Sequence, residues 1–292
     1  MKKLLFVINP KAGQKKRKNY AVGVVDIFEA AGYQVGIKYT KKRHDATGLV
    51  AKYGNRVDLI VCMGGDGTLN EVIEGMLKSH VATPLGYIPA GSTNDFANSL
   101  GLSSDPIEQA KNIVSKDARL LDMGCFNGRY FVYTASAGAF TKTSYSTPQK
   151  LKNKLGHAAY IFAGAKEIFR IKPLHLKIEL ENKTMEGEYV FAAINNATKV
   201  GGIMKIDKDL VKFNDGVFEL LLIDFPKNPL EFMKTVNKLF RQDFTGKIQL
   251  MHISKARITN CNDIDWSLDG EEEKGREVVE FHVVQDAIRF IY

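Results

Sequence analysis

A glycine-rich segment at residues 64–71 has the composition of a phosphate-binding turn. It consists of Gly64-Gly65-Asp66-Gly67-Thr68-Leu69-Asn70-Glu71, and it follows an apolar run and precedes a helical pattern. Three glycines in four positions let the backbone approach a ligand closely, and the N-terminus of the following helix favours an anion such as phosphate. Asp66 suits such a site if a divalent cation bridges its carboxylate and the phosphates. The alternative is a tight Asp-Gly turn in which Thr68 caps the helix and Glu71 completes a capping box.

Two carboxylates near the C-terminus could accept a proton from a substrate hydroxyl. Asp269 and Glu271 flank Gly270, so both acceptor groups lie on one short loop. Because an alcohol has a high pKa, such a base acts late, when the proton becomes acidic in the transition state. The alternative is a hairpin turn at Asp269-Gly270 that is followed by a solvated acidic run at 271–273.

The elements that must position the glycine-rich turn alternate between strands and helices. Nearly continuous apolar runs occur at 4–8, 35–39, 57–63 and 85–88, and helical patterns separate them at 22–28, 46–53 and 69–77. This alternation is typical of a parallel sheet that is covered on both faces. We therefore predict an α/β N-terminal domain, doubly wound and mostly parallel, whose ligands bind at the carboxyl ends of the strands.

The pattern changes after Asp122, where short alternating segments dominate. They occur at 130–133, 174–180, 189–194, 217–223, from 258 onward and at 278–284, with turn signals such as Asn127-Gly128 between them. Two helical patterns, near 155–170 and 228–241, interrupt them. We predict a C-terminal antiparallel β-sandwich domain. The predicted domains are 1–122 and 123–286, and residues 287–292 could return to the first domain.

The charge is unevenly distributed along the chain. The formal net charge is +8, and residues 1–43 hold eleven Lys and Arg against two acids. A second basic stretch at 142–172 has seven Lys and Arg against Glu167 alone. Such asymmetry predicts an anionic partner, with nucleic acid, nucleotide and anionic membrane as candidates.

Several protein classes are disfavoured by the composition. No apolar run approaches the ~18 residues of a transmembrane helix, and the first one is shorter than the ~7–15 residues of a signal peptide core. Cys62, Cys125 and Cys261 are widely spaced and form no close cluster with the six histidines. A disulfide framework and a zinc site are therefore not expected. We expect a cytoplasmic protein.

Residues 64–68 closely resemble the Gly-Gly-Asp-Gly-Thr signature of the diacylglycerol kinase catalytic domain, which sphingosine and ceramide kinases share and NAD kinases share more distantly. The segment is neither a Walker A loop nor a dinucleotide fingerprint. Other motifs of this family follow in the family's order, from residue 9 to residue 271. They are Asn9-Pro10-Lys11-Ala12-Gly13, Thr40, Pro89-Ala90-Gly91-Ser92-Thr93-Asn94-Asp95-Phe96-Ala97, Leu121-Asp122-Met123-Gly124 and Ser267-Leu268-Asp269-Gly270-Glu271. Ser92 stands where the family usually has Thr. The Asn-Asp-Phe-Ala and Asp-Gly-Glu motifs favour a lipid kinase over an NAD kinase.

The resemblance implies an ATP-dependent lipid kinase, which transfers the γ-phosphate of ATP to a lipid hydroxyl, most simply converting diacylglycerol to phosphatidic acid. It assigns Asp269 and Glu271 to catalysis and leaves open which of them is the base. It also implies that Asp66, Asp95 and Asp122 form an acidic network that holds Mg²⁺ through water. Taken alone, Asp95 could be a helix N-cap, and Asp122 could be an ordinary strand-end acid. The implied nucleotide contacts are Asn9, Pro10, Lys11, Ala12, Gly13, Thr40, Gly64, Gly65, Asp66, Gly67, Thr68, Leu69, Asn70, Glu71 and Thr93.

A second, structural Mg²⁺ is implied by some bacterial relatives, which bind it through an Asp flanked by two backbone carbonyls. The equivalent spacing here places carbonyls at Lys212 and Val217 around Asp215. The alternative is an Asn-Asp-Gly hairpin turn without a metal. Some relatives also form a homodimer, which this sequence does not reveal.

Reversible membrane docking is expected, because the substrate lies in a bilayer that the chain does not span. Basic clusters bind anionic headgroups at ~1 kcal/mol per Lys or Arg. The candidates are Lys15-Lys16-Arg17-Lys18 and the 142–172 stretch, and Phe140, Tyr145, Tyr160, Ile161 and Phe162 could line an acyl-chain entrance.

Three alternatives remain open from the sequence. The acceptor could be phosphatidylglycerol, a sphingoid base or an isoprenoid alcohol instead of diacylglycerol. The protein could instead be an NAD kinase-like enzyme that phosphorylates a soluble nucleotide. A nucleic-acid-binding module is disfavoured, because no recognised motif supports it.

Overall fold

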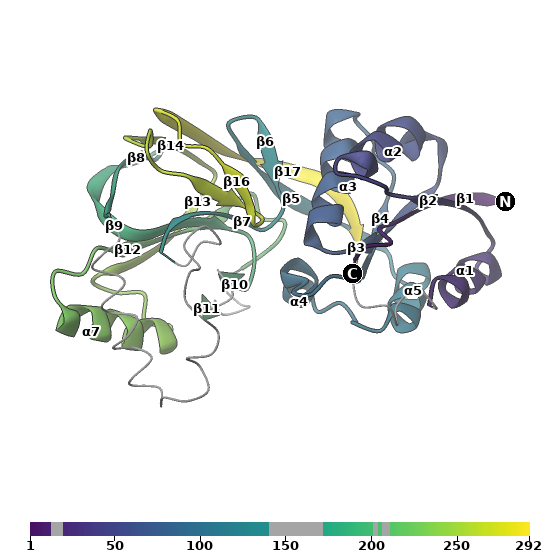
Figure 1. The fold of residues 1–292 in the computed structure, drawn as a ribbon, viewed down its shortest axis with the longest axis horizontal. Helices are drawn as coiled ribbons and strands as arrows, with labels where there is room; N and C mark the ends of the chain where they lie inside the picture. Colours follow the sequence, from purple (N-terminus) through teal and green to yellow (C-terminus); the bar gives the residue numbers. More distant parts are fainter. Residues whose placement is uncertain (13–19, 140–171, 201–203, 206–210) are drawn as a thin grey trace. The chain divides into compact units, whose positions relative to one another are not determined.

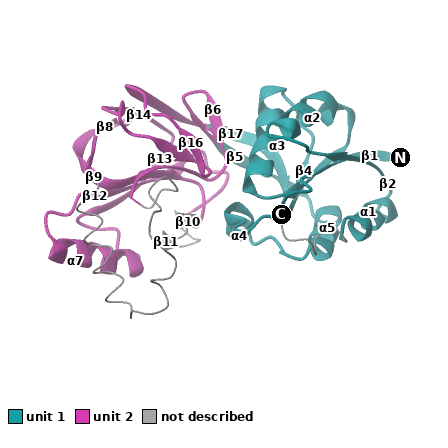
Figure 2. Ribbon diagram, in the orientation of Figure 1, with its two compact units in different colours: residues 1–123, 284–292 teal, residues 124–283 magenta. Residues whose placement is uncertain are grey.

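The computed structural model describes residues 1–12, 20–139, 172–200, 204–205 and 211–292 (Figure 1). The chain divides into two compact units (Figure 2). The first unit consists of Met1–Met123 and Val284–Tyr292, and the second of Gly124–Val283.

The first unit is built on a parallel sheet. Its strands are β1 (Lys2–Ile8), β2 (Tyr33–Tyr39), β3 (Leu59–Gly64), β4 (Leu85–Pro89) and the end of β17 (Val278–Ile291). Their order is β17-β4-β3-β1-β2, and every neighbouring pair is parallel. The predicted parallel α/β arrangement is confirmed. All residues of β3 and β4 are buried, which explains their unbroken apolar character.

Helices cover both faces of this sheet (Figure 1). Val24 and Phe28 of α1 (Tyr20–Ala30) pack with Ala110 and Ile113 of α5 (Pro106–Ser115) in a core that includes Phe6 of β1. Helices α2 (Asp45–Tyr53) and α3 (Asp66–Lys78) lie on the other face. A 3₁₀ turn at Gly54–Arg56 and the short helix α4 (Asp95–Leu100) complete the unit. Because β1, β3 and β4 are parallel, their carboxyl ends lie at the same edge of the sheet.

The second unit is antiparallel, as predicted. Its central strands pair in the order β7-β9-β8-β14-β17, and β12 pairs with both β9 and β13. Along β12, Phe218, Leu220 and Leu222 enter one core while Leu221 and Ile223 enter another, which is the period-two pattern of a buried strand. The strands of this unit are β5 (Ala118–Phe126, which begins in the first unit), β6 (Arg129–Phe131), β7 (Thr134–Gly138), β8 (Leu174–Glu179), β9 (Thr184–Asn195), β10 (Lys199–Val200), β11 (Met204–Lys205), β12 (Phe218–Asp224), β13 (Ile248–Ile253), β14 (Lys255–Thr259), β15 (Trp266–Leu268), β16 (Glu271–Glu273) and the beginning of β17.

Helix α7 (Pro229–Phe240) packs on the second of these cores. It matches the helical pattern that the sequence shows at 228–241. The helical pattern near 155–170 lies outside the described residues. Strand β9 has 12 residues and is longer than the predicted strand at 189–194.

The C-terminal segment forms one strand where the sequence suggests two. The predicted strand at 278–284 and the segment at 287–292 are parts of one strand, because β17 continues from Val278 to Ile291. The backbone of Asp286 has a φ of +50°, and its N–H donates to the Asp122 carboxylate at 2.8 Å. The side chain of Asp122 thus satisfies a backbone group at the irregular position, and the strand resumes.

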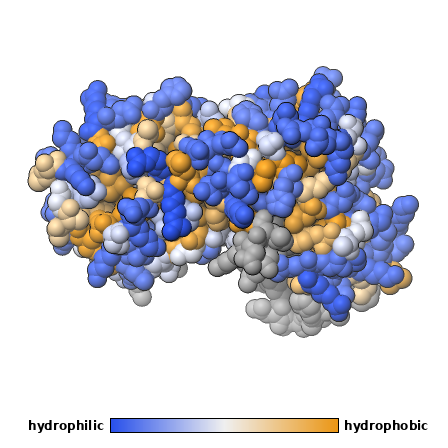
Figure 3. All heavy atoms as spheres, turned by 180° about the vertical axis from the view of Figure 1, so that it is seen from behind, coloured by the Kyte–Doolittle hydropathy of each residue, from blue (hydrophilic) through white to orange (hydrophobic). Residues whose placement is uncertain are grey.

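The surface is of mixed character. Figure 3 shows hydrophilic and apolar residues intermixed on the face that is turned away in Figure 1. Cys62, Cys125 and Cys261 are buried free thiols. No helix in the described part of the chain is both long and apolar enough to span a bilayer.

Candidate active site

The turns that follow β3 and β4 both contain glycine, and they meet at the carboxyl edge of the first unit's sheet. A Cβ atom on Gly91 would lie 2.7 Å from the Gly65 Cα, and one on Gly65 would lie 3.2 Å from the Gly91 Cα. A Cβ atom on Gly64 would lie 2.6 Å from the Cβ of Thr68. Side chains cannot occupy these positions without backbone movement, so close packing accounts for Gly64, Gly65 and Gly91.

Gly67 differs from these glycines, because it faces open space. No atom lies within 4 Å of a Cβ placed there. It sits in the first turn of α3, whose N-cap residue Gly65 provides no side-chain hydrogen bond. The first N–H groups of a helix lack intrahelical acceptors and attract anions. The start of α3 therefore has the geometry and the partial charge of a phosphate site.

The alternative capping box at this turn is not formed. Thr68 Oγ1 accepts a hydrogen bond from Asn9 Nδ2 at 2.8 Å, which joins the turns after β1 and β3. The carboxylate of Glu71 accepts from the backbone N–H groups of His44 at 2.9 Å and Ala46 at 3.2 Å. Glu71 therefore caps the neighbouring helix α2 instead of its own helix.

Asp66 is the carboxylate at the centre of this edge. Its Oδ2 accepts from the backbone N–H of Asp95 at 3.1 Å and from Thr93 Oγ1 at 3.4 Å. Its Oδ1 is buried and has no hydrogen-bond partner. Burial raises the pKa of Asp66, and the negative charge of Asp95 adds to the rise. A nearby cation would satisfy the remaining oxygen and favour the charged form.

Asp95 is not a helix N-cap and Asp122 is not a strand-end acid, which are the alternatives that the sequence allows for them. The N-cap position of α4 is occupied by Asn94, with φ +49°, and Asp95 is the first helical residue. Asp122 is 2% exposed and lies inside β5, not at a strand end. In the described part of the chain, no group of three or more His, Cys, Asp or Glu side chains is arranged to hold a metal ion. Within the predicted three-carboxylate network, Asp66 accepts a hydrogen bond from the backbone N–H of Asp95, and the Mg²⁺-holding role of the network stays a prediction.

The other residues expected to contact the nucleotide differ in their exposure to solvent. Asn9 anchors the loop after β1, because its Oδ1 accepts from the Lys11 N–H at 3.0 Å and its carbonyl accepts from the Ala12 N–H at 3.1 Å. Pro10 belongs to this loop, and Gly13 lies outside the described residues. Leu69 is buried in the core, and Thr40 is 8% exposed. Gly67, Asn70 and Thr93 are more accessible.

In the second unit, Asp269 is an anchor for the backbone. Its Oδ2 accepts from the Val132 N–H at 2.6 Å, and its Oδ1 accepts from the N–H groups of Tyr133 and Thr134, each at 3.0 Å. Its own N–H donates to the Thr134 carbonyl at 2.8 Å. Asp269 is 5% exposed, and both of its oxygens are engaged. Its φ of +49° and the φ of +85° at Gly270 build a tight hairpin between β15 and β16.

Glu271 has a different environment from Asp269. Its side chain is 31% exposed, and its Oε2 lies 2.6 Å from Arg129 Nη2. Arg129 Nη1 lies 2.9 Å from Glu273 Oε2 and also donates to the Glu272 carbonyl at 3.2 Å. Arg129 thus holds the side chains of Glu271 and Glu273 on one face of β16. The acidic run is therefore a braced strand and not only a solvated tail.

The structural-metal candidate forms a turn in the structure. Asp215 is exposed, its Oδ1 accepts from the Val217 N–H at 3.3 Å, and Gly216 has a φ of +78°. These features form a turn ahead of β12, which pairs with β9 and β13, so the turn does not join two paired strands as a hairpin does; Lys212 is exposed beside it. A metal bound by Lys212, Asp215 and Val217 stays a prediction.

Glu219, four residues after Asp215, has no role in the sequence-based predictions. It is 1% exposed, and its Oε2 has no hydrogen-bond partner. Burial raises the pKa of Glu219 to about 8, and Asp215 adds to the rise. Arg129 was also missed, because its partners lie more than 140 residues away in the sequence.

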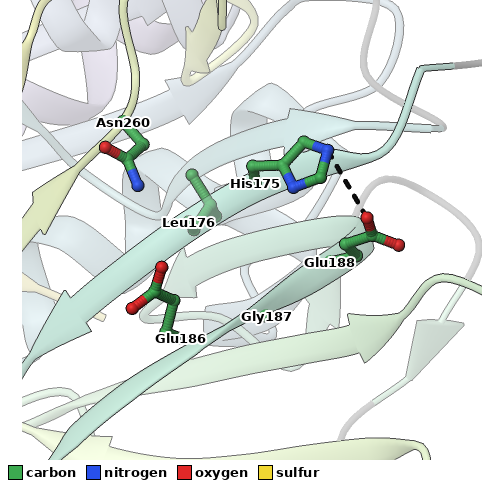
Figure 4. Close-up of a pocket in the computed structure, with 6 residues that line it drawn as sticks. All are labelled: His175, Leu176, Glu186, Gly187, Glu188 and Asn260. Atoms are coloured by element: carbon green, nitrogen blue, oxygen red, sulfur yellow. Dashed lines mark ion pairs between the residues drawn. The ribbon is translucent and has the colours of Figure 1, made fainter.

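A shallow pocket in the second unit contains none of the predicted site residues. Figure 4 shows His175 and Glu188 facing one another across neighbouring strands, at 3.5 Å. Both side chains are more than half exposed. The pocket is lined by His175, Leu176, Glu186, Gly187, Glu188 and Asn260. The basic clusters expected to dock on a membrane, Lys15 to Lys18 and residues 142–171, and the apolar residues Phe140, Tyr145, Tyr160, Ile161 and Phe162 lie outside the described residues.

Comparison with known protein families covers nearly the whole chain. Residues 3–126 match the family described as diacylglycerol kinase catalytic domain. Residues 134–292 match the family described as YegS C-terminal NAD kinase beta sandwich-like domain. The boundary between these two matches lies close to the division into compact units.

Individual relatives support the same relationship. A diacylglycerol kinase of Bacillus subtilis is 32% identical over 275 residues, which is 93% of this chain and 90% of that protein. A diacylglycerol kinase of Staphylococcus saprophyticus is 31% identical over 92% of this chain and 89% of its own length. A Bacillus anthracis crystal structure superposes over 100% of this chain and 97% of its own, with a TM-score of 0.82 and 25% identity.

Proposed function

The chain belongs to the diacylglycerol kinase family, and from this we propose that it transfers the γ-phosphate of ATP to the hydroxyl of diacylglycerol to give phosphatidic acid. The observation that carries the proposal is the contrast between Asp269 and Glu271. One carboxylate is fully engaged by backbone N–H groups, and the other is partly exposed and braced by an arginine.

The first unit supplies the phosphate site for ATP. The N-terminal turn of α3 presents backbone N–H groups, and Gly67 leaves space for a phosphate to approach them. Asn9 and Thr68 tie the loop after β1 to this turn. The triphosphate would lie along these two turns, with the basic residues Lys11, Lys41 and Lys42 on the loops that follow β1 and β2.

The residues at this edge fit a bound Mg²⁺. Asp66 Oδ1 is buried without a partner, and Mg²⁺ commonly binds one or two carboxylates together with waters and phosphate oxygens. Asp66 would hold the ion, and Asp95 lies beside it, because its backbone N–H donates to Asp66 Oδ2 at 3.1 Å. When bound, Mg²⁺ neutralises the charge that develops on the transferred phosphoryl group.

Glu271 is the residue that we assign as general base. The lipid hydroxyl oxygen forms a bond to the γ-phosphorus while the bond from phosphorus to the β–γ bridging oxygen breaks, so that ADP leaves. The hydroxyl proton moves to the Glu271 carboxylate as the alcohol becomes acidic. Arg129 orients that carboxylate at 2.6 Å. Asp269 acts as a positioning residue, because its three backbone hydrogen bonds hold the turn that carries Glu271.

A transfer assay with matched variants tests the proposal. The purified full-length chain is incubated with labelled ATP, Mg²⁺ and diacylglycerol in mixed micelles, and labelled phosphatidic acid is measured. We expect Glu271→Gln to lower kcat by roughly 10²- to 10⁴-fold, the usual contribution of a general base. Glu272→Gln is the control, because the Glu272 side chain pairs with Lys274, and the contact of Glu272 with Arg129 is made by its backbone carbonyl, which the substitution keeps. Equal activity in the wild type and Glu271→Gln would refute the assignment of the base.

The acceptor is tested in the same assay. Phosphatidylglycerol, a sphingoid base, an isoprenoid alcohol and NAD replace diacylglycerol in parallel reactions. We expect the highest kcat/KM with diacylglycerol. A higher value with another lipid would change the substrate but keep the lipid kinase, whereas phosphorylation of NAD alone would overturn the proposed function.

A further inference from the structure

A buried tyrosine hydroxyl connects the carboxyl ends of β3 and β4. Tyr87 lies in β4 and is fully buried. Its hydroxyl donates to the carbonyl of Gly64, the last residue of β3, at 3.0 Å, and it lies 3.5 Å from Oδ1 of Asn94 in the turn after β4. We name these two contacts the Tyr87 bridge. A buried tyrosine hydroxyl usually finds a hydrogen-bond partner, and here both partners belong to the edge of the sheet that carries the candidate phosphate site.

Asn94 closes the turn that follows β4. Its Oδ1 accepts a hydrogen bond from the Gly91 N–H at 2.9 Å, and its Nδ2 donates to the Gly91 carbonyl at 3.0 Å. Its backbone has a φ of +49°, a left-handed conformation that asparagine tolerates better than most residues. The oxygen that the Tyr87 hydroxyl approaches is therefore the same oxygen that holds the start of this turn.

The turn that Asn94 closes also orients the Asp66 carboxylate. Thr93 and Asp95, the two neighbours of Asn94, donate to Asp66 Oδ2 through a side-chain hydroxyl at 3.4 Å and a backbone N–H at 3.1 Å. The other oxygen, Oδ1, is buried and has no hydrogen-bond partner. Because both donors to Oδ2 come from this turn, a shift of the turn would rotate the carboxylate and move Oδ1.

The backbone around Tyr87 is held by contacts that do not involve its hydroxyl. The Gly64 carbonyl also accepts a hydrogen bond from the Ala90 N–H at 2.6 Å, and the Tyr87 carbonyl accepts one from Gln109 Nε2 of α5 at 3.1 Å. Phenylalanine at position 87 would fill the same space and leave the Gly64 carbonyl paired. The contribution of the hydroxyl can therefore be measured in a folded protein.

We propose that Tyr87 is a positioning residue for the Mg²⁺ complex of ATP. Its hydroxyl sets the spacing between Gly64 and Asn94, and the turn that Asn94 closes orients the Asp66 carboxylate. The inference rests on the proposed function in that it takes Mg²⁺-ATP as the ligand at this edge of the sheet. It goes further, because neither Tyr87 nor Asn94 is among the residues expected to contact the nucleotide.

Isothermal titration calorimetry of the full-length chain with a non-hydrolysable ATP analogue tests the role of Tyr87 without catalysis. Tyr87→Phe is expected to weaken binding of the analogue in Mg²⁺ by about 3- to 10-fold, the range that the loss of one neutral hydrogen bond gives. In chelator its affinity is expected to match that of the wild type, because Asp66 acts on the nucleotide through the ion. Asn94→Gly keeps the left-handed backbone conformation, removes both contacts with Gly91, and is expected to weaken binding in Mg²⁺ as well.

A double-mutant cycle with Asp66→Asn tests the route through the carboxylate. Two residues that act through one network have effects that do not add. Tyr87→Phe is therefore expected to cause no further loss of affinity in Mg²⁺ when Asp66 is already Asn. A further loss of the same size as in the wild-type background would show that the hydroxyl acts by another route and would overturn the inference.

Two matched controls lie in the same unit. Tyr33→Phe makes the same chemical change at the amino end of β2, on the opposite edge of the parallel sheet. Ser99→Ala removes a buried hydroxyl of α4 that donates to the Asp95 carbonyl at 3.0 Å, a contact within one helix. Both variants are expected to bind the analogue as the wild type does. Circular dichroism confirms that each variant is folded.

The outcomes separate the role of Tyr87 from the proposed function. Wild-type affinity of Tyr87→Phe in Mg²⁺, or equal weakening in Mg²⁺ and in chelator, would overturn the inference and keep the kinase. In steady-state kinetics, Tyr87→Phe is expected to raise the KM for Mg²⁺-ATP and to leave the KM for diacylglycerol unchanged. An equal rise of both KM values would indicate a general disturbance and would also overturn the inference. Absence of analogue binding by the wild type would reject the proposed function, and the inference with it.

Discussion

Replacing Asp269 by asparagine separates structural support from chemistry at the β15–β16 hairpin. Asparagine has nearly the same size and tolerates the left-handed backbone conformation that φ +49° requires. The turn itself is therefore not strained by the change. What changes is the set of acceptors, because the carboxylate receives three backbone N–H groups and an amide offers one oxygen.

The expected cost follows from these three hydrogen bonds. The amide oxygen can replace Oδ1 and keep Tyr133 and Thr134, but its NH₂ group then faces the N–H of Val132. A buried donor without an acceptor costs about 1–3 kcal/mol, and each of the other two bonds loses about 1 kcal/mol when its acceptor is no longer charged. We therefore expect Asp269→Asn to lower the free energy of unfolding by about 4 kcal/mol, a large share of the ~5–15 kcal/mol typical of a domain.

Urea unfolding followed by tryptophan fluorescence measures this loss. Trp266 is the single tryptophan of the chain, it is 1% exposed, and it lies in β15 beside the turn. The shift in midpoint gives the change in stability if the slope is unchanged. Glu271→Gln is the control, because a partly exposed ion pair contributes only ~0–1 kcal/mol. It should unfold near the wild-type midpoint while losing activity.

The opposite pattern would refute this reasoning. If Asp269→Asn unfolds like the wild type and yet lacks kinase activity, the Asp269 carboxylate takes part in the chemistry, and its backbone contacts do not explain its role. If Glu271→Gln instead keeps kcat, the base must be sought at another residue.

Three further predictions concern other residues. Arg129→Met should lower kcat by roughly 10- to 100-fold through misplacement of Glu271, with the KM for ATP unchanged in steady-state kinetics; an unaltered kcat would remove Arg129 from the reaction. Because the Glu219 pKa is about 8 in the folded protein against 4.5 in the unfolded chain, the folded state holds the extra proton, and the free energy of unfolding should fall as pH rises from about 4.5 to about 8. Glu219→Gln should flatten this slope in chelator-containing buffer, and an identical slope in the variant would place the titration elsewhere. Gly91→Ala should weaken ATP binding in calorimetry, since its Cβ would lie 2.7 Å from the Gly65 Cα; wild-type affinity would show that the two turns can separate at no cost.

The fold class followed from local sequence patterns. An unbroken apolar strand such as β3 indicates burial on both faces, and an alternating strand such as β8 indicates burial on one face, because burial acts on each side chain along the strand. The glycine-rich turn could also be found, since the close approach of the backbone at Gly65 selects against a side chain.

The role of a side chain whose hydrogen-bond partner lies far away in the sequence could not be predicted from local patterns. Glu71 lies at the right spacing for a capping box with Thr68, yet it caps α2, because its acceptor oxygens meet two N–H groups from another helix. The predicted strand at 278–284 ends before Asp286, yet Asp122 accepts a hydrogen bond from the Asp286 N–H and β17 continues to Ile291. The spacing of residues in the sequence indicates which contacts a side chain can make within its own helix or strand. Packing between helices and strands decides which contacts it actually makes.

The sequence by itself thus determined the two kinds of sheet, the glycine-rich turn and the pair of candidate carboxylates. Only the tertiary structure distinguished the members of that pair. Asp269 and Glu271 are two residues apart and chemically alike, but the hairpin turns the first toward three backbone N–H groups and the second toward Arg129. The availability of a carboxylate depends on the donors around it, and here those donors come from residues 129–134, about 140 residues earlier in the chain.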